Sequence, residues 1–263
     1  EMGAAAGSAE RNDDGSLKSF TPANFVLGFG AIDGRRCIVG GEDFTLRGGS
    51  PNEAGLRKSV YAEDMACQYR VPLIRIHEGG GGSVTGAGGK TVGNPPNTPP
   101  RFRSVARALG TVPVVTAALG PVAGLPASRL VASHFSVMTK ETAQVLIAGP
   151  KVVERALRET KTKEELGGAQ VHTRNGVVDN LARDEEDALA QIRTFLSYLP
   201  QNVWELPPRA DPMDDPNRQD NALLSLIPRD RRQIFDVRKM LGMILDDGAF
   251  FEMARGYGRG QVI

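Results

Sequence analysis

Two apolar runs that end in glycine turns dominate the hydrophobic pattern of this chain. The longer one opens residues 112–131, and a continuous apolar stretch of this kind is typical of a strand buried on both faces. It breaks at Gly120-Pro121 and Gly124, and the sequence restarts as a helix with Pro126 in its first turn. This order predicts backbone N–H groups free to bind an anion or a developing oxyanion. An ordinary βα unit without a site is the alternative interpretation.

A second run, residues 71–76, favours the first interpretation. It is entered by the same Val-Pro pair and also ends in a glycine turn, residues 79–83. Open α/β sheets place their ligands at the carboxyl edge of parallel strands. If the two strands are parallel neighbours, both turns meet at that edge, and we expect a site built from backbone amides.

The rest of the pattern predicts alternating short strands and amphipathic helices. A hairpin turn is expected at Asp33-Gly34, and a helix should begin with Ser50 as its cap and Pro51 in its first turn. The strands are expected at 24–32, 35–41, 44–47, 134–138 and 144–148, and the helices at 50–69, 101–109, 126–131, 150–158, 163–168, 184–199 and 236–245. Buried positions expected in the helices are Leu56, Val60, Met65, Tyr69, Leu189, Ile192, Phe195, Leu196 and Leu199. Polar residues 1–23 predict a mobile lead-in, and the acidic, proline-rich residues 205–216 predict a linker.

Composition narrows the classes of function. The 263 residues carry a formal net charge of +1 with no basic run, so neither nucleic acid nor an anionic membrane is expected as a partner. No apolar run is long enough to span a bilayer. Cys37 and Cys67 lie in apolar or helical patterns and are interpreted as buried thiols, with a disulfide as the alternative.

Several familiar motifs are only partly present. Gly28-Phe29-Gly30 leads into another strand, where a dinucleotide site requires a helix. Lys90-Thr91 follows glycines but precedes a proline-rich segment, so a phosphate-binding P-loop is not expected. The nucleophile motif Gly-x-Ser-x-Gly is absent. The side chains therefore indicate no particular catalytic chemistry, and the backbone amides of the glycine turns remain the candidate site.

Histidine spacing does not suggest a metal site. His77, His134 and His172 are interpreted as structural, although His77-Glu78 lies beside the glycine turn, where a carboxylate could orient the loop. Arg129 and Lys140 could touch a polyphosphate, with solvation at the surface as the alternative.

Five motifs in one order carry a family resemblance. They are Phe29-Gly-x-x-Asp-Gly34, Glu42-Asp-Phe-Thr-x-x-Gly-Gly-Ser50, Gly120-Pro-x-Ala-Gly124, Ile147-Ala-Gly-Pro150 and Glu165-Leu-Gly-Gly-Ala169 with His172. Together they resemble the N-terminal half of biotin-dependent acyl-CoA carboxyltransferases, the β subunits of propionyl-CoA and methylcrotonyl-CoA carboxylases. The resemblance covers residues 24–200, and residues 201–263 look like a linker and the entry to a second half that is absent here.

The resemblance implies a fold, an activity and partners. The fold is an α/β crotonase-type ββα superhelix, and the activity moves a carboxyl group from carboxybiotin to an acyl-CoA through an enolate held by amides. Expected partners are a biotin carboxylase and biotin carboxyl carrier subunit and further copies of the chain, as dimers assembled into a hexamer. The biotin-side half must come from another chain or from a longer molecule. The implied location is cytoplasmic, or the mitochondrial matrix if eukaryotic.

The resemblance also assigns site residues. The catalytic amides are those of Gly81, Gly82, Gly124 and Leu125, the substrate-binding residues are Gly80, Ser83, Ala123 and Arg129, and no metal is implied. Relatives usually have arginine near Ser83 and Gly-Ala in place of Leu125-Pro126, which bears on acyl selectivity and activity. A biotin-linked acyl-CoA decarboxylase subunit and a catalytically degenerate assembly paralogue therefore remain as alternatives.

Overall fold

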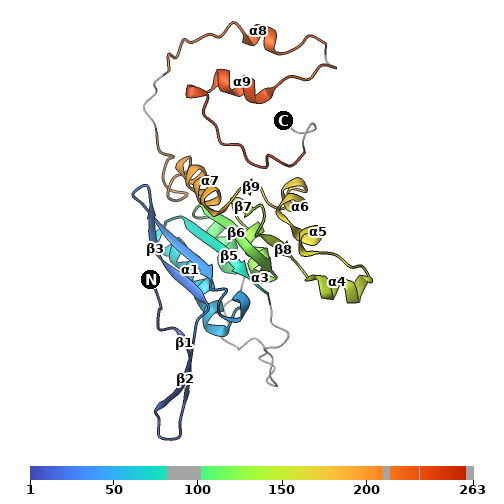
Figure 1. Ribbon diagram of the computed structural model, residues 1–263. Helices are drawn as coiled ribbons and strands as arrows, with labels where there is room; N and C mark the ends of the chain where they lie inside the picture. The colour runs from blue at the N-terminus through green and yellow to red at the C-terminus, as the bar shows by residue number, and fades with distance from the viewer. Residues whose placement is uncertain (82–101, 210–213, 231, 259–263) are drawn as a thin grey trace.

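The centre of the molecule is a twisted sheet, whose strands lie side by side in Figure 1. The computed structural model describes residues 1–81, 102–209, 214–230 and 232–258. Within these residues the sheet has the order β3-β4-β5-β6-β7-β9, and β8 pairs with the far end of β6. The strands are β3 (Phe25–Ile32), β4 (Arg35–Glu42), β5 (Leu73–Gly79), β6 (Val114–Ala123), β7 (Phe135–Thr139), β8 (Gln144–Leu146) and β9 (Asn180–Ala182). Only the β3–β4 pair is antiparallel, because the hairpin turn forms at Asp33-Gly34 as predicted.

Helices cover both faces of this sheet. On one face lie α1 (Glu53–Tyr69), α2 (Arg103–Leu109) and α3 (Leu125–Val131), and on the other lies α7 (Glu185–Ser197). The remaining helices are α4 (Pro150–Leu157), α5 (Lys163–Gly167), α6 (Ala169–Arg174), α8 (Leu223–Leu226) and α9 (Val237–Ile244), with the 3-10 turns η1 (Arg47–Gly49) and η2 (Asp246–Gly248). None of the described helices is both long and apolar enough to cross a bilayer.

Side chains of β5 alternate between the two covered faces of the sheet, so each of them is either apolar or needs a polar partner. Leu73 packs into the core beneath α1, whereas its neighbour Ile74 packs against the core beneath α7. A strand covered on both faces needs no solvent-facing polar positions. Arg75 and His77 interrupt the apolar run on the α1 face, and both are fully buried. Such burial requires partners.

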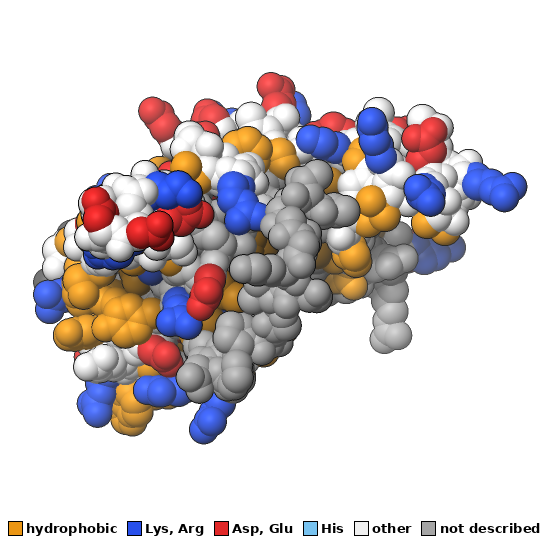
Figure 2. Space-filling view, turned by 90° about the horizontal axis from the view of Figure 1, so that it is seen from below, with side chains coloured by type: hydrophobic (Ala, Val, Ile, Leu, Met, Phe, Trp, Pro, Cys, Tyr) orange, Lys and Arg blue, Asp and Glu red, His pale blue; other side chains and the backbone are white. Residues whose placement is uncertain are grey.

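Three of the described helices, α4, α8 and α9, bury none of their residues, and α4 projects from the body. The helix α4 and the segment before it expose apolar side chains, including Ile147, Val152 and Leu157. In the space-filling view, the side of the molecule that carries α4 shows apolar side chains between charged ones (Figure 2). An amphipathic helix with both sides exposed gains little from packing within its own chain.

The N-terminal segment differs from the prediction of a mobile lead-in. Within residues 1–23, β1 (Gly7–Arg11) and β2 (Leu17–Pro22) pair as an antiparallel hairpin. The N–H of Met2 also donates a hydrogen bond to the Leu27 carbonyl on the edge of β3, at 2.7 Å. The polar composition hid this pairing because both strands are exposed on both faces and therefore show no apolar alternation.

Three other local predictions are wrong. Residues 44–46 form a turn and Arg47 begins η1, so the strand expected at 44–47 is not present. The strand β6 does not break at Gly120-Pro121; it continues to Ala123 because its pairing changes there from β7 to β8. The cap of α1 is Asn52, whose side chain accepts the Gly55 N–H, so Ser50 is free for another role.

The buried positions predicted for the helices are partly correct. Val60, Met65, Ile192, Phe195 and Leu196 are buried, Leu56 and Leu199 are half-buried, and Tyr69 and Leu189 are exposed. The structure also contains α6, β9 and α8, which the pattern did not predict, because each is only three to six residues long.

The C-terminal segment returns to the sheet. The ring of Phe251 packs edge-on against Phe135 with centroids 5.3 Å apart, and the Asn180 amide donates to the Glu252 carbonyl at 3.1 Å. Asn202 is also buried and donates to the Arg70 carbonyl at 3.0 Å. Parts of residues 201–263 therefore pack on the body formed by residues 24–200.

Candidate functional site

The two glycine turns predicted to meet are in van der Waals contact. β5 and β6 are parallel neighbours, and each ends at the same edge of the sheet. A Cβ atom built on Gly81 would lie 3.1 Å from the Cα of Gly124 and 3.2 Å from the carbonyl oxygen of Ala123. Gly124 has φ +65° and ψ −125°, a conformation that glycine adopts far more readily than other residues. The backbones can approach this closely because neither residue has a side chain.

One N–H group of each turn is left without a backbone acceptor. The Gly80 N–H donates to the Gly48 carbonyl at 2.9 Å, and the Gly124 N–H to the Leu146 carbonyl at 3.4 Å. Within the described residues, the Gly81 N–H has no backbone acceptor. Leu125 is the first residue of α3, where an N–H has no acceptor inside the helix. Across one contact, the two turns thus bring together two N–H groups that have no backbone acceptor in the part of the chain that the structure describes.

The 3-10 turn η1 supports the first of these turns from behind. Gly48 and Gly49 both have positive φ, and a Cβ on Gly49 would lie 2.5 Å from the Cα of Gly79. The Ser50 hydroxyl donates to the carbonyl of Gly81 at 2.7 Å. This bond anchors the peptide group on one side of Gly81. The Gly-Gly-Ser sequence of the second motif therefore packs against the glycine turn and supports it.

The site residues named from the sequence fall into three groups. Gly80, Gly81, Gly124, Leu125 and Ala123, the last residue of β6, lie at or beside the contact between the turns. Gly82 and Ser83 lie outside the described residues, as does the excluded P-loop segment. Arg129 is only 3 % exposed, which does not fit the expected contact with substrate.

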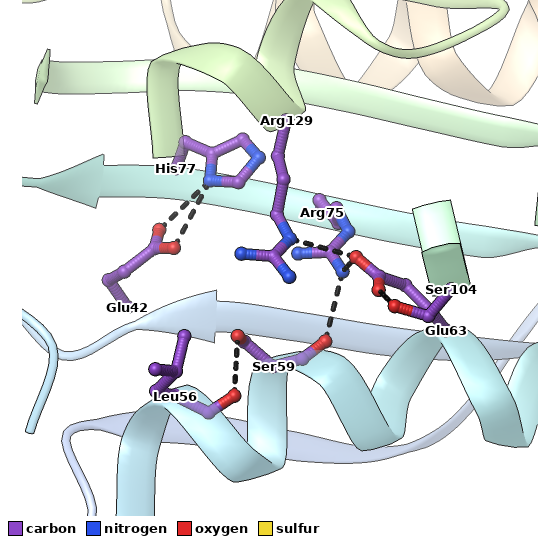
Figure 3. A network of polar contacts seen from close by, with 8 residues as sticks. All are labelled: Glu42, Leu56, Ser59, Glu63, Arg75, His77, Ser104 and Arg129. Atoms are coloured by element: carbon purple, nitrogen blue, oxygen red, sulfur yellow. Dashed lines mark hydrogen bonds and ion pairs between the residues drawn. The ribbon is translucent and has the colours of Figure 1, made fainter. Parts of the chain in front are cut away.

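Arg129 belongs instead to a buried network of charges below the turns (Figure 3). Glu63 on α1 accepts hydrogen bonds through Oε1 from Arg129 Nε at 2.8 Å and from Arg75. Its other oxygen, Oε2, accepts from the Ser104 hydroxyl. Arg75 also donates to the Ser59 carbonyl at 3.0 Å. Burial lowers the pKa of Arg75 to about 10, opposed by attraction to Glu63, so the guanidinium stays charged at neutral pH.

A second buried pair lies beside this network, between the ends of β4 and β5. His77 Nδ1 lies 3.0 Å from the Glu42 Oε2, and since a carboxylate only accepts, Nδ1 donates. Burial raises the pKa of Glu42, but His77 and Arg75 outweigh it, and the net pKa lies below its usual value of 4.5. His77 therefore binds Glu42 and not Glu78, which the sequence placed beside the turn.

The sequence did not indicate this network. Glu63 lies in the middle of a helix, and its two arginine partners are 12 and 66 positions away. The usable signal is a charged residue on the apolar face of β5, Arg75, because such a residue needs a buried partner.

A small cavity of about 10 Å³, enough for about one water molecule, lies beside Leu125 and is lined also by Glu42, Ser59 and Arg129.

The remaining titratable candidates have structural surroundings. His134 bridges two backbone groups: its Nδ1 accepts the Val114 N–H and its Nε2 donates to the Leu109 carbonyl, each at 3.0 Å. His172 Nε2 lies 2.8 Å from the Val145 carbonyl. Cys37 and Cys67 are buried free thiols, as predicted, and burial raises the pKa of both. No set of three His, Cys, Asp or Glu side chains in the described ranges could hold a metal ion.

The order of turns, strands and helices matches known proteins over most of the chain. The family described as carboxyl transferase domain matches residues 4–263. This chain belongs to the carboxyl transferase domain family. The resemblance found in its motifs is thereby confirmed, and so is the crotonase-type α/β fold, since the same architecture recurs in solved carboxyltransferases.

The relatives of this carboxyl transferase domain are named for several different reactions. The chain is 35% identical over 239 residues to the propionyl-CoA carboxylase carboxyltransferase subunit of Haloferax mediterranei, covering 90% of this chain and 46% of that protein. It is 34% identical to the methylmalonyl-CoA decarboxylase subunit alpha of Veillonella parvula, over 88% of this chain and 45% of the relative. The transcarboxylase 12S structure, with hydrolysed methylmalonyl-coenzyme A bound, aligns with a TM-score of 0.78 and 28% identity, over 90% of this chain and 46% of that one. The chain spans about half the length of these relatives.

Proposed function

We propose that this chain is the acyl-CoA-binding part of a biotin-dependent carboxyltransferase. One observation carries the proposal: the N–H groups of Gly81 and Leu125, which have no backbone acceptor among the described residues, flank the contact between two glycine turns. Two backbone donors at one contact suit a thioester carbonyl whose oxygen gains negative charge during reaction. The relatives named for propionyl-CoA and methylmalonyl-CoA support an acyl-CoA as the ligand.

The proposed reaction replaces one acidic C–H bond by a C–C bond. Loss of the proton next to the thioester gives an enolate, and its carbon attacks the carboxyl carbon that carboxybiotin supplies. The N–C bond to that carboxyl group then breaks, and the nitrogen ends with the proton. The role of this chain is to bind the thioester oxygen at Gly81 and Leu125, which favours the enolate without any charged side chain.

The amide of Leu125 can be tested separately from its side chain. Proline is tolerated at the first position of a helix, so Leu125→Pro deletes the N–H while α3 can still form. Removing one such donor costs roughly 3 kcal/mol, or about a hundredfold in kcat. Leu125→Ala is the matched control, since it keeps the N–H and removes the side chain. Carboxyl transfer from a carboxybiotin carrier protein to propionyl-CoA is measured for both; equal rates would contradict the proposal.

A decarboxylase is the second candidate, because a methylmalonyl-CoA decarboxylase subunit is nearly as similar as the carboxylase subunit. The same donors would then stabilise the enolate formed as the carboxyl group leaves. Incubation with methylmalonyl-CoA and uncarboxylated biotin carrier separates the two directions. CoA binding without transfer in either direction would favour a degenerate paralogue that serves assembly.

We further propose that the chain works with a biotin carrier subunit and with other copies in an oligomer. A neighbour solved as a hexamer, transcarboxylase 12S, supports this assembly. The exposed apolar side chains of α4 are also consistent with burial against another subunit. Light scattering of the purified protein gives the mass, and a monomer at working concentration would count against the oligomer.

A further inference from the structure

Glu63 connects the two elements that carry the glycine turns. Its Oε1 accepts from Arg75, which belongs to β5, and from Arg129 Nε, which belongs to α3, at 2.8 Å. In Figure 3 dashed lines join both arginines to this one carboxylate. Glu63 itself is 1 % exposed and sits on α1, which packs against β3, β4 and β5. A single side chain thus contacts both halves of the candidate site from below.

A short stretch of backbone links each arginine to a donor. Arg75 lies six residues before Gly81: β5 ends at Gly79, and Gly81 follows in the turn, where its carbonyl accepts from Ser50. Arg129 lies four residues after Leu125, one turn along α3. The paired strand and the helical turn hold their residues in place, and Gly48 and Ser50 hold the turn beyond Gly79, so the positions of the two arginines bear on the positions of the two N–H groups. We infer that Glu63 is a positioning residue that sets the distance between the Gly81 and Leu125 N–H groups and so the site's selectivity for a thioester carbonyl.

The charges of the network suit this role. Two guanidinium groups, Arg75 and Arg129, are matched by two carboxylates, Glu63 and Glu42, all of them largely buried. Buried ion pairs often add little net stability compared with apolar side chains, but their bonds are directional. Ser104 occupies the other oxygen of Glu63, which prevents the carboxylate from rotating. The arrangement therefore specifies an orientation more strictly than apolar packing would.

The inference rests on the proposed function and can be tested without turnover. Calorimetry on the full chain compares propionyl-CoA with S-propyl-CoA, a thioether that lacks the carbonyl oxygen. Two hydrogen bonds to the carbonyl are expected to make the thioester bind about tenfold more tightly in the wild type. Glu63→Gln is expected to reduce this ratio to near one while the affinity for S-propyl-CoA stays within about twofold, because the CoA contacts are unchanged.

Two further variants separate positioning from stability. Arg129→Met removes one positive charge and leaves the Glu63–Arg75 pair intact, so it tests the link to α3 even where Glu63→Gln does not fold. Ile192→Ala is the matched control: it destabilises the core beneath α7, on the other face of the sheet, and should keep the tenfold ratio. A preserved ratio in both Glu63→Gln and Arg129→Met would overturn the inference and leave the proposed function intact. A ratio of one in the wild type would overturn both.

Discussion

Gly124 faces Gly81 so closely that a Cβ atom on Gly124 would lie 2.9 Å from the Cα of Gly81. This contact joins the ends of β5 and β6, and it depends on two residues without side chains. Any side chain at Gly124 must push the turns apart or distort α3 at its first turn. The geometry of the two free donors is therefore set by glycine as much as by the strands.

Gly124→Ala is expected to abolish the site while most of the fold persists. The substitution adds the close contact with Gly81 to the cost of a positive φ, so we expect a loss of about 2–4 kcal/mol in the free energy of unfolding. Carboxyl transfer should fall at least a hundredfold. Gly15→Ala is the matched control, because Gly15 also has positive φ but no atom lies within 4 Å of its Cβ position. Chemical denaturation and transfer assays measure both; similar losses of activity in the two variants would refute the role of the contact.

The Ser50 hydroxyl is expected to matter for the site more than for the fold. Ser50→Ala removes its hydrogen bond to the Gly81 carbonyl, which should cost about 1 kcal/mol of stability. Transfer should slow about tenfold, because the peptide group beside Gly81 loses its anchor. Ser59→Ala is the control. It removes an equally buried hydroxyl, which donates to the Leu56 carbonyl in the same helix. That variant should lose similar stability and keep its rate, and a slowed rate there would point to general loosening.

Glu42 gives the fold a defined dependence on pH. Its pKa is lowered in the folded state, so the unfolded chain binds the proton more readily, and stability falls as pH drops below 4.5. In urea titrations between pH 6 and pH 3, Glu42→Gln should therefore show a shallower decline in stability than the wild type. Glu10→Gln, at an exposed position on β1, should decline as the wild type does. Parallel curves for wild type and Glu42→Gln would show that the carboxylate is not held ionised by His77 and Arg75.

Local features of the fold could be predicted from the sequence, and long-range contacts could not. The β3–β4 hairpin, the two buried strands and the start of α7 at Asp184 follow from turn residues and periodicity. The meeting of the glycine turns was predicted because parallel strands share a carboxyl edge. The Glu63–Arg129 pair spans 66 positions, and no periodicity encodes such a pairing. The break in the strand expected at Gly120-Pro121 is wrong for a similar reason. β6 stays paired there with β8, a strand that lies further along the chain.

The return of the C-terminal segment to the sheet gives a prediction about stability. Phe251 contacts the rings of Phe135 and Phe195, with centroids 5.3 Å and 6.2 Å away, although the pattern suggested only the entry to another domain. Phe251→Ala should lower the free energy of unfolding by about 2 kcal/mol, less than for a fully buried phenylalanine because this ring is half-buried. Phe44→Ala, at a ring that is 44 % exposed, should change it by less than about 1 kcal/mol. Equal effects of the two substitutions in urea denaturation would mean that residues 249–257 do not contribute to the core.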